Sequence, residues 1–383
     1  MILGIDASTA GSGGAKRHLI ELLKRFDPQK HQVCKVIVWG TSQMLNELPE
    51  RESIIKITHP YLNKGFFYRS IWQIFLRNKS FSNRFDLLFS PFGTYSNKNT
   101  PYVSMSRNML LFDKSERERF GYSLLRLKLF LLRLKQIKSF RNANGIIFIS
   151  NYAFQTIKQQ IKLNTIKTKI INHGVSSNFK GDIKEQKLSD SYSVNNPFKF
   201  LYVSSIWPYK HQIKVVKSIS KLRLNNYPVS LTIVGCNDYP SYGNKLKKLI
   251  QEVDPYSEFI RWDEKVSLDQ IHLKYNIADA FIFASSCENM PNILIEAMSA
   301  GLPIISSNYQ PMPEFLKDSG IYFNPLKEND LEEKCIKLFI NNEQRNQLSK
   351  KSKSYSEIYT WDKCADETFE FLYSILNNTN VKK

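Results

Sequence analysis

The sequence has few cysteines, and they form no recognisable pairs. Its 383 residues include five cysteines, an odd number, and no CxxC pair occurs. Scattered cysteines of this kind exclude a zinc ribbon and a disulfide framework, and they favour a reducing compartment. The five are Cys34, Cys236, Cys287, Cys335 and Cys364.

Long apolar runs are also missing. No uninterrupted apolar stretch approaches the ~20 residues that are needed to span a bilayer. The N-terminus enters a short apolar strand, Met1–Asp6, without the basic start and longer apolar run of a signal peptide. The sequence therefore predicts a cytoplasmic protein, either free or peripheral to a membrane.

Acidic residues are scarce in the first half of the chain. Residues 1–200 contain 32 Lys and Arg but 13 Asp and Glu, whereas residues 201–383 contain 22 of each kind. The whole net charge of +19 therefore lies in the first half. A positive face of this kind suits nucleic acid, an anionic membrane or a phosphorylated acceptor, although a generally basic proteome would explain it as well. No recognised DNA- or RNA-binding motif is present.

A dinucleotide fingerprint is absent too. The glycine-rich turn at residues 6–17 contains Gly13 and Gly14, but its spacing is not G-x-G-x-x-G. No acid follows at the distance that a dinucleotide requires, which disfavours a nicotinamide enzyme.

Strand-like and helix-like segments alternate along most of the chain. This order predicts an α/β fold of two Rossmann-like domains, with parallel sheets, helices on both faces and a cleft between the domains. The polar segment 178–196 predicts a linker between an N-terminal domain at 1–177 and a C-terminal domain at 197–355. The expected strands are 2–6, 33–39, 53–57, 86–90, 102–105, 145–150, 169–172, 199–204, 231–235, 259–262, 280–285 and 304–307. The expected helices are 16–26, 122–140, 151–160, 213–224, 244–253, 268–275 and 293–300.

The segment 284–303, ASSCENMPNILIEAMSAGLP, carries the most chemical information. It follows an apolar strand, and a helix is expected to begin near Pro291, because proline is favoured in the first turn. Glu288 lies on the loop, where its carboxylate can accept hydrogen bonds from sugar hydroxyls. Glu296 lies within the helix and can reach ribose hydroxyls. Backbone amides at the start of this helix predict a diphosphate site, and its residues are Asn289, Met290, Pro291, Asn292 and Ile293.

Glu288 and Glu296 reproduce the E-x7-E motif of retaining GT-B glycosyltransferases, and the string EAMSAGLPII is similar to glycosyltransferase family 4. The resemblance is strong over residues 200–325 and weaker over 2–179. It implies a first domain for the acceptor, a second domain for a nucleotide-sugar donor, and a C-terminal helix at 356–383 that crosses back to the first domain. Solvated acids on a loop and on a helix are the alternative for the two glutamates taken singly.

The same resemblance assigns the groups that neutralise the leaving diphosphate. Lys210, in the segment YVSSIWPYK, matches the family's lysine, whereas Ser205 stands where an arginine is usual. No D-x-D triplet occurs, so we expect no metal and no cofactor, and Lys210 together with the helix start replaces the metal. Whether Ser205 weakens the activity stays open at this point.

Further positions in the first half resemble the donor-sugar and acceptor side of the family. Gly13 and Gly14 lie on the loop that approaches the donor, where glycine lets the backbone come close. A His-Asp pair that many relatives carry is missing after residues 102–105, and Arg107 or Asn108 is the candidate substitute. His173 matches a family motif at the end of the first domain, where a structural role is favoured.

The segment 122–140 is rich in Leu, Phe, Lys and Arg and contains no acid. It predicts a basic amphipathic helix that can lie on an anionic membrane surface. A core helix whose basic side chains cover its apolar face is the alternative reading.

Taken together, the sequence predicts a retaining hexosyltransferase for cell-surface polysaccharide, such as lipopolysaccharide or O-antigen. It would use a UDP- or GDP-sugar and a glycan or polyprenyl-diphosphate-linked acceptor at the inner face of the cell membrane, without nucleic acid. The alternatives are a sugar-nucleotide epimerase of the same fold and a basic or inactive binding protein. The sugar, base, acceptor linkage and oligomeric state are not encoded in these patterns.

Overall fold

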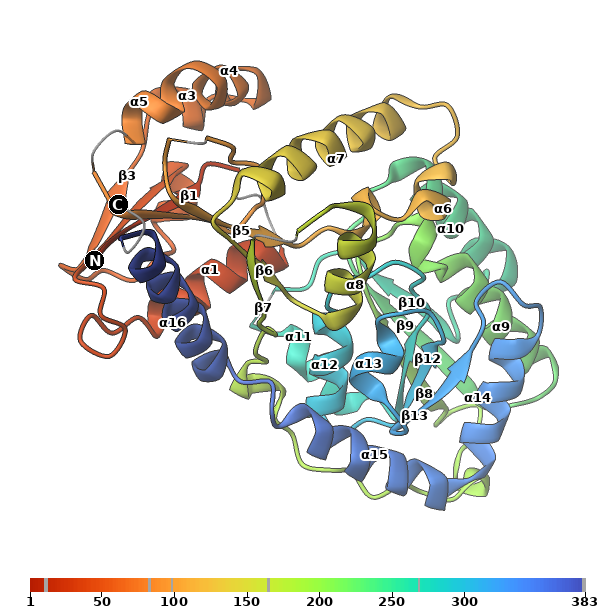
Figure 1. Ribbon diagram of the computed structural model, residues 1–383. Helices are drawn as coiled ribbons and strands as arrows, with labels where there is room; N and C mark the ends of the chain where they lie inside the picture. The colour runs from red at the N-terminus through yellow and green to blue at the C-terminus, as the bar shows by residue number, and fades with distance from the viewer. Residues whose placement is uncertain (10–12, 82–83, 98, 164–165, 268, 381–383) are drawn as a thin grey trace. The chain divides into compact units, whose positions relative to one another are not determined.

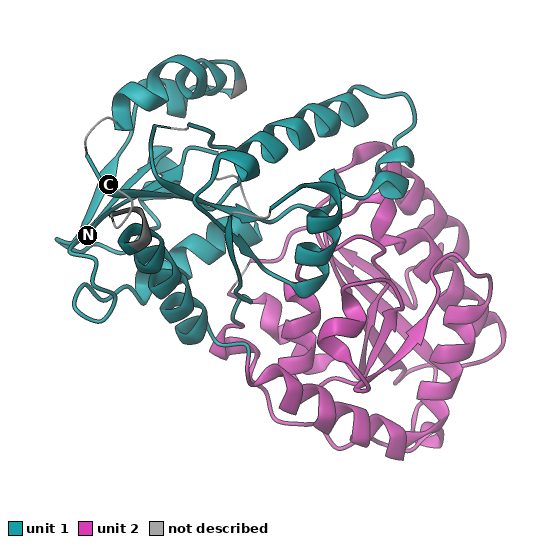
Figure 2. Ribbon diagram, viewed as in Figure 1, with its two compact units in different colours: residues 1–174, 359–383 teal, residues 175–358 magenta. Residues whose placement is uncertain are grey.

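The computed structural model describes residues 1–383 except 10–12, 82–83, 98, 164–165, 268 and 381–383. The chain separates into two compact units (Figure 2). Unit 1 comprises Met1–Gly174 and Tyr359–Lys383, and unit 2 comprises Val175–Ile358. The chain thus leaves unit 1 once and returns to it with its C-terminal segment.

The described part of unit 1 contains a seven-stranded parallel sheet in the order β3-β2-β1-β4-β5-β6-β7 (Figure 1). Its inner strands are apolar runs that are buried on both faces, as expected for a parallel sheet covered by helices. The strands are β1 (Ile2–Ala7), β2 (Lys35–Gly40), β3 (Ile54–Ile57), β4 (Leu87–Ser90), β5 (Tyr102–Ser106), β6 (Gly145–Phe148) and β7 (Lys167–Ile170).

The helices of unit 1 form where apolar residues recur at helical spacing or where a polar residue caps the first turn. The Ser150 hydroxyl accepts from the amide of Ala153 at 3.1 Å and so begins α8. The helices are α1 (Gly14–Lys24), α2 (Ser42–Leu45), α3 (Pro60–Asn63), α4 (Phe66–Ile71), the π-helix η1 (Trp72–Leu76), α5 (Arg77–Phe81), the 3-10 turn η2 (Met109–Leu111), α6 (Lys114–Glu118), α7 (Leu124–Asn142), α8 (Asn151–Gln160) and α16 (Trp361–Asn380).

Unit 2, as far as it is described, contains six parallel strands in the order β10-β9-β8-β11-β12-β13. This is the doubly wound order, in which the direction of chain progression reverses between β8 and β11. The strands are β8 (Phe198–Val203), β9 (Val229–Val234), β10 (Ile260–Asp263), β11 (Ala280–Phe283), β12 (Ile304–Ser307) and β13 (Gly320–Phe323). The helices are η5 (Pro208–Lys210), α9 (Gln212–Leu224), α10 (Pro240–Val253), α11 (Ile271–Ile277), α12 (Asn292–Ser299), α13 (Met312–Leu316), α14 (Asp330–Ile340) and α15 (Asn342–Ser356).

The segment predicted as a linker, 178–196, is packed within unit 2. It begins with the 3-10 turn η3 (Ser177–Phe179) and contains a second one, η4 (Ser189–Ser191). The fully buried Arg345 of α15 donates to the backbone carbonyl of Lys187 and to Gln186 Oε1. Polar composition therefore indicated an irregular backbone, but the hydrogen bonds of Arg345 hold that backbone in place.

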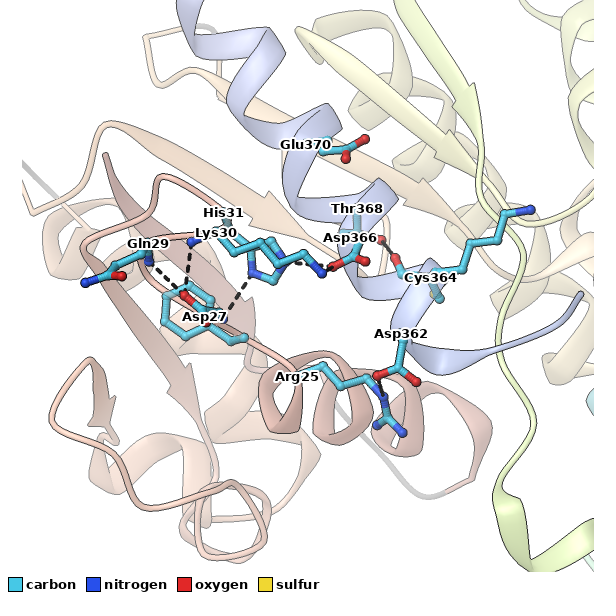
Figure 3. Close-up of polar contacts among 12 residues, drawn as sticks. Arg25, Asp27, Gln29, Lys30, His31, Asp362, Cys364, Asp366, Thr368 and Glu370 are labelled. Atoms are coloured by element: carbon cyan, nitrogen blue, oxygen red, sulfur yellow. Dashed lines mark hydrogen bonds and ion pairs between the residues drawn. The ribbon is translucent and has the colours of Figure 1, made fainter.

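Helix α16 belongs to unit 1, and it is bound by a cluster of ion pairs (Figure 3). The Asp366 carboxylate accepts from His31 Nε2 at 3.0 Å and lies 2.6 Å from Lys30 Nζ. Arg25 Nε donates to Asp362 at 3.0 Å. The Phe369 ring stacks on the His31 ring at 4.5 Å between centroids. This contact fixes α16 against the segment that follows α1.

The two parallel sheets confirm the predicted α/β class with its two Rossmann-like units. The strand predicted at 169–172 lies at Lys167–Ile170, and the strand Gly320–Phe323 and the helices at residues 60–81 were not predicted. Leu268 of the predicted helix 268–275, and residues 381–383 of the predicted C-terminal helix, lie outside the described residues. The cleft between the units stays a prediction.

Candidate functional site

Two loops of unit 2 meet at the point where the strand order reverses. Strands β8 and β11 are neighbours, with Phe200 paired to Ala280. The loops that follow them, 204–210 and 284–291, therefore leave the same edge of the sheet side by side. In open α/β folds, ligands bind at this reversal point beyond the carboxyl ends of the strands.

The loops bring Lys210 and Glu288 together in an ion pair between Nζ and Oε1. Both are largely withdrawn from water, with 9% of the lysine side chain and 15% of the glutamate side chain exposed. The ammonium also lies 5.6 Å from the centre of the Phe283 ring and 5.4 Å from that of Tyr209. These two predicted catalytic residues thus occupy one place in the structure.

Several hydrogen bonds fix the two loops to each other. The amide of Ser286 donates to the carbonyl of Tyr209 at 2.9 Å, and the Ser286 hydroxyl pairs with His211 Nε2 at 2.9 Å. The Tyr202 hydroxyl donates to the carbonyl of Lys210. Burial raises the pKa of Tyr202 well above its ordinary value, so this hydroxyl stays protonated and remains a donor. The ion pair is therefore held by a rigid frame.

Glu296 lies on the inner side of α12. It is buried, and its Oε2 accepts from the Tyr275 hydroxyl of α11 at 3.2 Å. The predicted start of α12 is close to the observed one, with Pro291 as the residue before the helix. The amide of Asn292 donates to the carbonyl of Met290 at 3.0 Å.

That hydrogen bond changes the expectation for the diphosphate site. The sequence predicted that the Asn292 amide would donate to a diphosphate. In the structure this amide donates to the carbonyl of Met290, in its own loop. Asn289, Met290 and Pro291 are buried, whereas Asn292 and Ile293 are half-buried. The helix start is thus present, but part of its hydrogen-bonding capacity is already used.

Ser205, which stands in the usual place of an arginine, belongs to the loop 204–210 and is half-buried. Its carbonyl accepts from Gln212 Nε2 at 3.0 Å, which ties it to the start of α9. Gly235, after β9, approaches this strand end so closely that a Cβ there would lie 2.0 Å from the carbonyl oxygen of Ser204. The backbone around Ser205 therefore requires glycine at position 235.

In unit 1, Gly13 and Arg107 shape the loop that follows β1. Gly13 has φ of +85°, a conformation that favours glycine, and it precedes the first turn of α1. Arg107 Nη2 donates to the carbonyl of Gly14 at 3.0 Å. Burial lowers the pKa of Arg107 to about 10. Residues 10–12 of this predicted loop lie outside the described residues.

The contacts of Asn108 and His173 stabilise the local fold. The Asn108 side chain accepts from the amide of Leu110 at 3.1 Å and caps η2. His173 is buried, and its ring lies 5.7 Å from that of Trp361. A Cβ at Gly174 would lie 2.1 Å from the amide nitrogen of Trp361, so the chain can leave unit 1 beside α16 because residue 174 is glycine.

Sequence reasoning missed two buried groups in unit 1. The His18 ring lies 4.6 Å from the His173 ring, and burial, followed by the charges of His173 and Arg107, lowers its pKa well below the ordinary value. Asp6, at the end of β1, accepts from the Ser8 amide at 3.1 Å and pairs with Arg77 at 3.4 Å. The helical stripe of α1 could have marked His18 as inward-facing, but no local pattern marks Arg77.

Across the described part of the chain, no three His, Cys, Asp or Glu side chains form a group that could hold a metal ion. In the same residues, no helix combines the length and the apolar character that crossing a bilayer demands.

Comparison with known proteins gives two family matches that follow the two units. Residues 12–179 match Glycosyltransferase Family 4, and residues 184–355 match Glycosyl transferases group 1. A solved structure, Anabaena Alr3699/HepE in complex with UDP and glucose, superposes with a TM-score of 0.70 at 16% identity. The superposition covers 98% of this chain and 100% of that one, which shows a shared fold.

Two curated relatives extend the comparison. O-antigen chain mannosyltransferase RfbU of Salmonella typhimurium is 23% identical over 196 residues, which is 51% of this chain and 50% of the relative. Alpha-monoglucosyldiacylglycerol synthase of Acholeplasma laidlawii is 30% identical over 201 residues, which is 52% and 49% of the two chains. The aligned parts thus span about half the length of these relatives. With both units matched and the fold shared over almost its whole length, the chain belongs to the GT-B glycosyltransferases of family 4.

Proposed function

We propose that this protein transfers a hexosyl unit from a UDP- or GDP-sugar to a growing, lipid-linked cell-surface glycan, with retention of the anomeric configuration. The observation that carries the proposal is the buried Lys210–Glu288 pair at the reversal point of the unit 2 sheet. A fixed cation and a fixed carboxylate at this edge suit a donor that carries both a diphosphate and sugar hydroxyls.

In the proposed complex the two charges act on different parts of the donor. The Lys210 ammonium binds the diphosphate and stabilises the negative charge that develops on it as the leaving group departs. The Glu288 carboxylate then accepts hydrogen bonds from the sugar hydroxyls and orients the ring. Glu296 accepts from the ribose, for which its carboxylate has to share or exchange the bond from Tyr275.

The reaction breaks the bond between the anomeric carbon and the diphosphate oxygen, and it forms a bond between that carbon and the acceptor hydroxyl oxygen. The electron pair of the broken bond leaves with the nucleoside diphosphate. A donor phosphate oxygen takes the acceptor proton on the same face, which retains the configuration. No protein nucleophile is assigned in this scheme.

Positive groups of the chain replace a metal in this proposal. Lys210 is held in place before the donor arrives, by its ion pair and by the rings of Tyr209 and Phe283. Such a preorganised cation needs no reorganisation when charge develops. We therefore expect transfer to continue in EDTA.

The acceptor class rests on the relatives and on the charge of unit 1. One relative is named for an O-antigen chain and another for a glucosylated diacylglycerol, so both are associated with surface glycans or lipids. The segment 122–140, which is helical from Leu124 onward in α7, exposes Tyr122 and Leu124 to solvent at its start. Apolar and basic groups together favour contact with an anionic membrane, and we place the protein at the inner face of the cell membrane.

Turnover with a panel of nucleotide sugars and lipid-diphosphate acceptors tests the proposal. We expect one donor to be used and Glu288→Ala to abolish transfer, while its circular dichroism at the assay temperature stays near that of the wild type. Glu333→Ala, which removes an exposed acid of α14 in the same unit, is the matched control and should keep full activity. Near-normal turnover by Glu288→Ala removes the assignment of Glu288. A donor that is converted to another sugar nucleotide without any acceptor identifies an epimerase instead.

A further inference from the structure

Helix α7 exposes apolar residues where a surface helix usually exposes polar ones. Leu124, Leu127, Leu131 and Leu134 are 45–86% exposed. The buried positions of α7 are of both kinds: Leu129 and Phe140 are apolar, whereas Gln136 and Ser139 are polar. The carbonyl of Ser139 accepts from the buried Tyr102 hydroxyl at 2.6 Å. The helix predicted at 122–140 therefore exposes these four leucines, while Leu129 is buried. Exposed apolar surface of this extent marks a binding surface.

A second exposed apolar segment lies next to α7 on the same unit. In α4 and η1, four aromatic and aliphatic side chains are 42–72% exposed. They are Phe67, Tyr68, Ile74 and Phe75. They lie in residues 60–81, where the sequence predicts no helix or strand. Figure 1 shows α4 and α7 on the same side of the unit 1 sheet.

The two segments enclose a groove of about 900 Å³. One wall comes from α4 and η1, with Arg69 and Gln73, and the other comes from the leucines of α7. At its inner end lie Thr9, which follows β1, and Thr94, which follows β4. Strands β1 and β4 are neighbours at the reversal point of the unit 1 sheet, the place where open α/β sheets bind ligands. The groove thus connects an apolar surface to the predicted acceptor side, and its volume is typical of a ligand site.

The charges around this groove have one sign. Arg69, Lys128, Lys135 and Lys138 line it, and the sequence contains no Asp or Glu at residues 53–85 or 119–181. Nε of Arg69 is buried and has no hydrogen-bond partner among the described residues. Four cations beside a leucine-lined wall match a molecule with an anionic head and a long apolar chain.

We propose that this groove binds the lipid part of the acceptor, a single-chain prenyl or acyl diphosphate. The chain lies against Leu127, Leu131 and Leu134, and the diphosphate lies against Lys135, Lys138 and Arg69. The attached sugar then points to the inner end of the groove, at Thr9 and Thr94. This inference rests on the proposed function, since it gives the acceptor of that reaction a place to bind.

Calorimetric titration of farnesyl diphosphate in buffer without any bilayer tests the groove directly. We expect binding to the wild type, and affinity reduced by about tenfold in Lys135→Gln/Lys138→Gln, because charge-assisted bonds to the head are lost. Lys158→Gln/Lys162→Gln, which changes two exposed lysines of the same unit outside the groove, is the matched control and should bind normally. Leu131→Ala/Leu134→Ala should also lose about tenfold, whereas Leu224→Ala/Leu326→Ala, on exposed leucines of unit 2, should not.

Three results overturn the proposal. The first is no binding of farnesyl diphosphate to the wild type, or unchanged affinity in both groove variants. The second is inorganic diphosphate binding as tightly as farnesyl diphosphate, which would mean a phosphate site without a lipid groove. In the third, the groove variants lose only sedimentation with phosphatidylglycerol vesicles, which would make this face a membrane contact.

The same variants separate this inference from the proposed function. If both groove variants transfer sugar to a lipid-diphosphate acceptor with an unchanged KM, the lipid-binding role of the groove is refuted and the transferase assignment is kept. Farnesyl diphosphate binding that depends on the groove residues, in a protein that uses no nucleotide sugar, supports the groove and removes the transferase.

Discussion

Lys210 and Glu288 carry opposite charges in a setting with little access to water, so each depends on the other. Breaking a buried pair leaves one charge uncompensated, which costs about 3 kcal/mol or more. We expect Lys210→Met to lower the free energy of unfolding of unit 2 by about that amount, and Lys210→Met/Glu288→Gln to recover most of it. Urea unfolding, followed by the signal of unit 2, measures this double-mutant cycle. A loss under about 0.5 kcal/mol in the single variant would place the pair in solvent.

His18 should make the stability of unit 1 dependent on pH. Its folded pKa is well below the unfolded value of about 6.5, because burial disfavours the charged ring. The folded state therefore binds fewer protons, and stability that is complete above about pH 6.5 decreases as the pH falls toward the folded pKa. The slope reaches about 1.4 kcal/mol per pH unit for one proton.

The variant His18→Leu removes this proton-binding group. We expect it to resemble the wild type near pH 7.5 and to lose less stability than the wild type near pH 5, as measured by urea unfolding at both values. Parallel losses in the two proteins would show that another group causes the pH dependence.

The residues of the site differ in how far the sequence reveals them. Glu288 and Glu296 share one short string, and Lys210 lies in another, so a family pattern was enough to select them as candidates. Their actual partners came from the fold. Tyr275 binds Glu296 from α11, and the Asn292 amide is engaged by its own loop, and neither contact leaves a local mark in the sequence.

Helix α16 depends on packing against the segment after α1 (Figure 3). The Phe369 ring is buried between His31 and Phe26, with centroids at 4.5 and 5.2 Å. Removing a buried phenyl ring leaves a cavity and costs about 3–5 kcal/mol. We expect Phe369→Ala to lower the melting temperature of unit 1 and to speed amide hydrogen exchange in α16.

The control for that variant is Glu370→Ala, at the next position of the helix, whose carboxylate is exposed and lies 3.9 Å from Lys169. It should leave both readouts unchanged. Normal exchange in Phe369→Ala would show that α16 is held by its ion pairs and not by the ring.

Elements with a clear period were predictable, and short or irregular ones were not. The strands of both sheets are apolar runs with turn residues between them, and α8 is predicted at the residues where it occurs. Helices α3, α4 and α5 are short: α3 begins at Pro60, α4 follows Gly65, and a π-helix joins α4 to α5, so no helical period develops. For this reason the sequence does not predict the wall of the proposed lipid groove that α4 and η1 form.

Considered as a whole, the chain combines a basic unit with a unit of balanced charge. The basic unit contains the leucine-lined groove, and the balanced unit contains the Lys210–Glu288 pair. This division supports an anionic lipid acceptor on one unit and a nucleotide sugar on the other. Composition alone indicated the asymmetry but could not separate a membrane, a nucleic acid and a phosphorylated acceptor, because all three are polyanions.

The most direct test is the titration of UDP and GDP into the wild type, Lys210→Ala and Glu288→Ala in the presence of EDTA. We expect one nucleotide to bind the wild type, Lys210→Ala to weaken it by about tenfold or more, and Glu288→Ala to keep the nucleotide within about threefold. Glu288 contacts the sugar in this account, so its loss should appear in transfer and not in nucleotide affinity. Failure of both nucleotides to bind, or equal affinity in the wild type and Lys210→Ala, would contradict the assignment of the donor site.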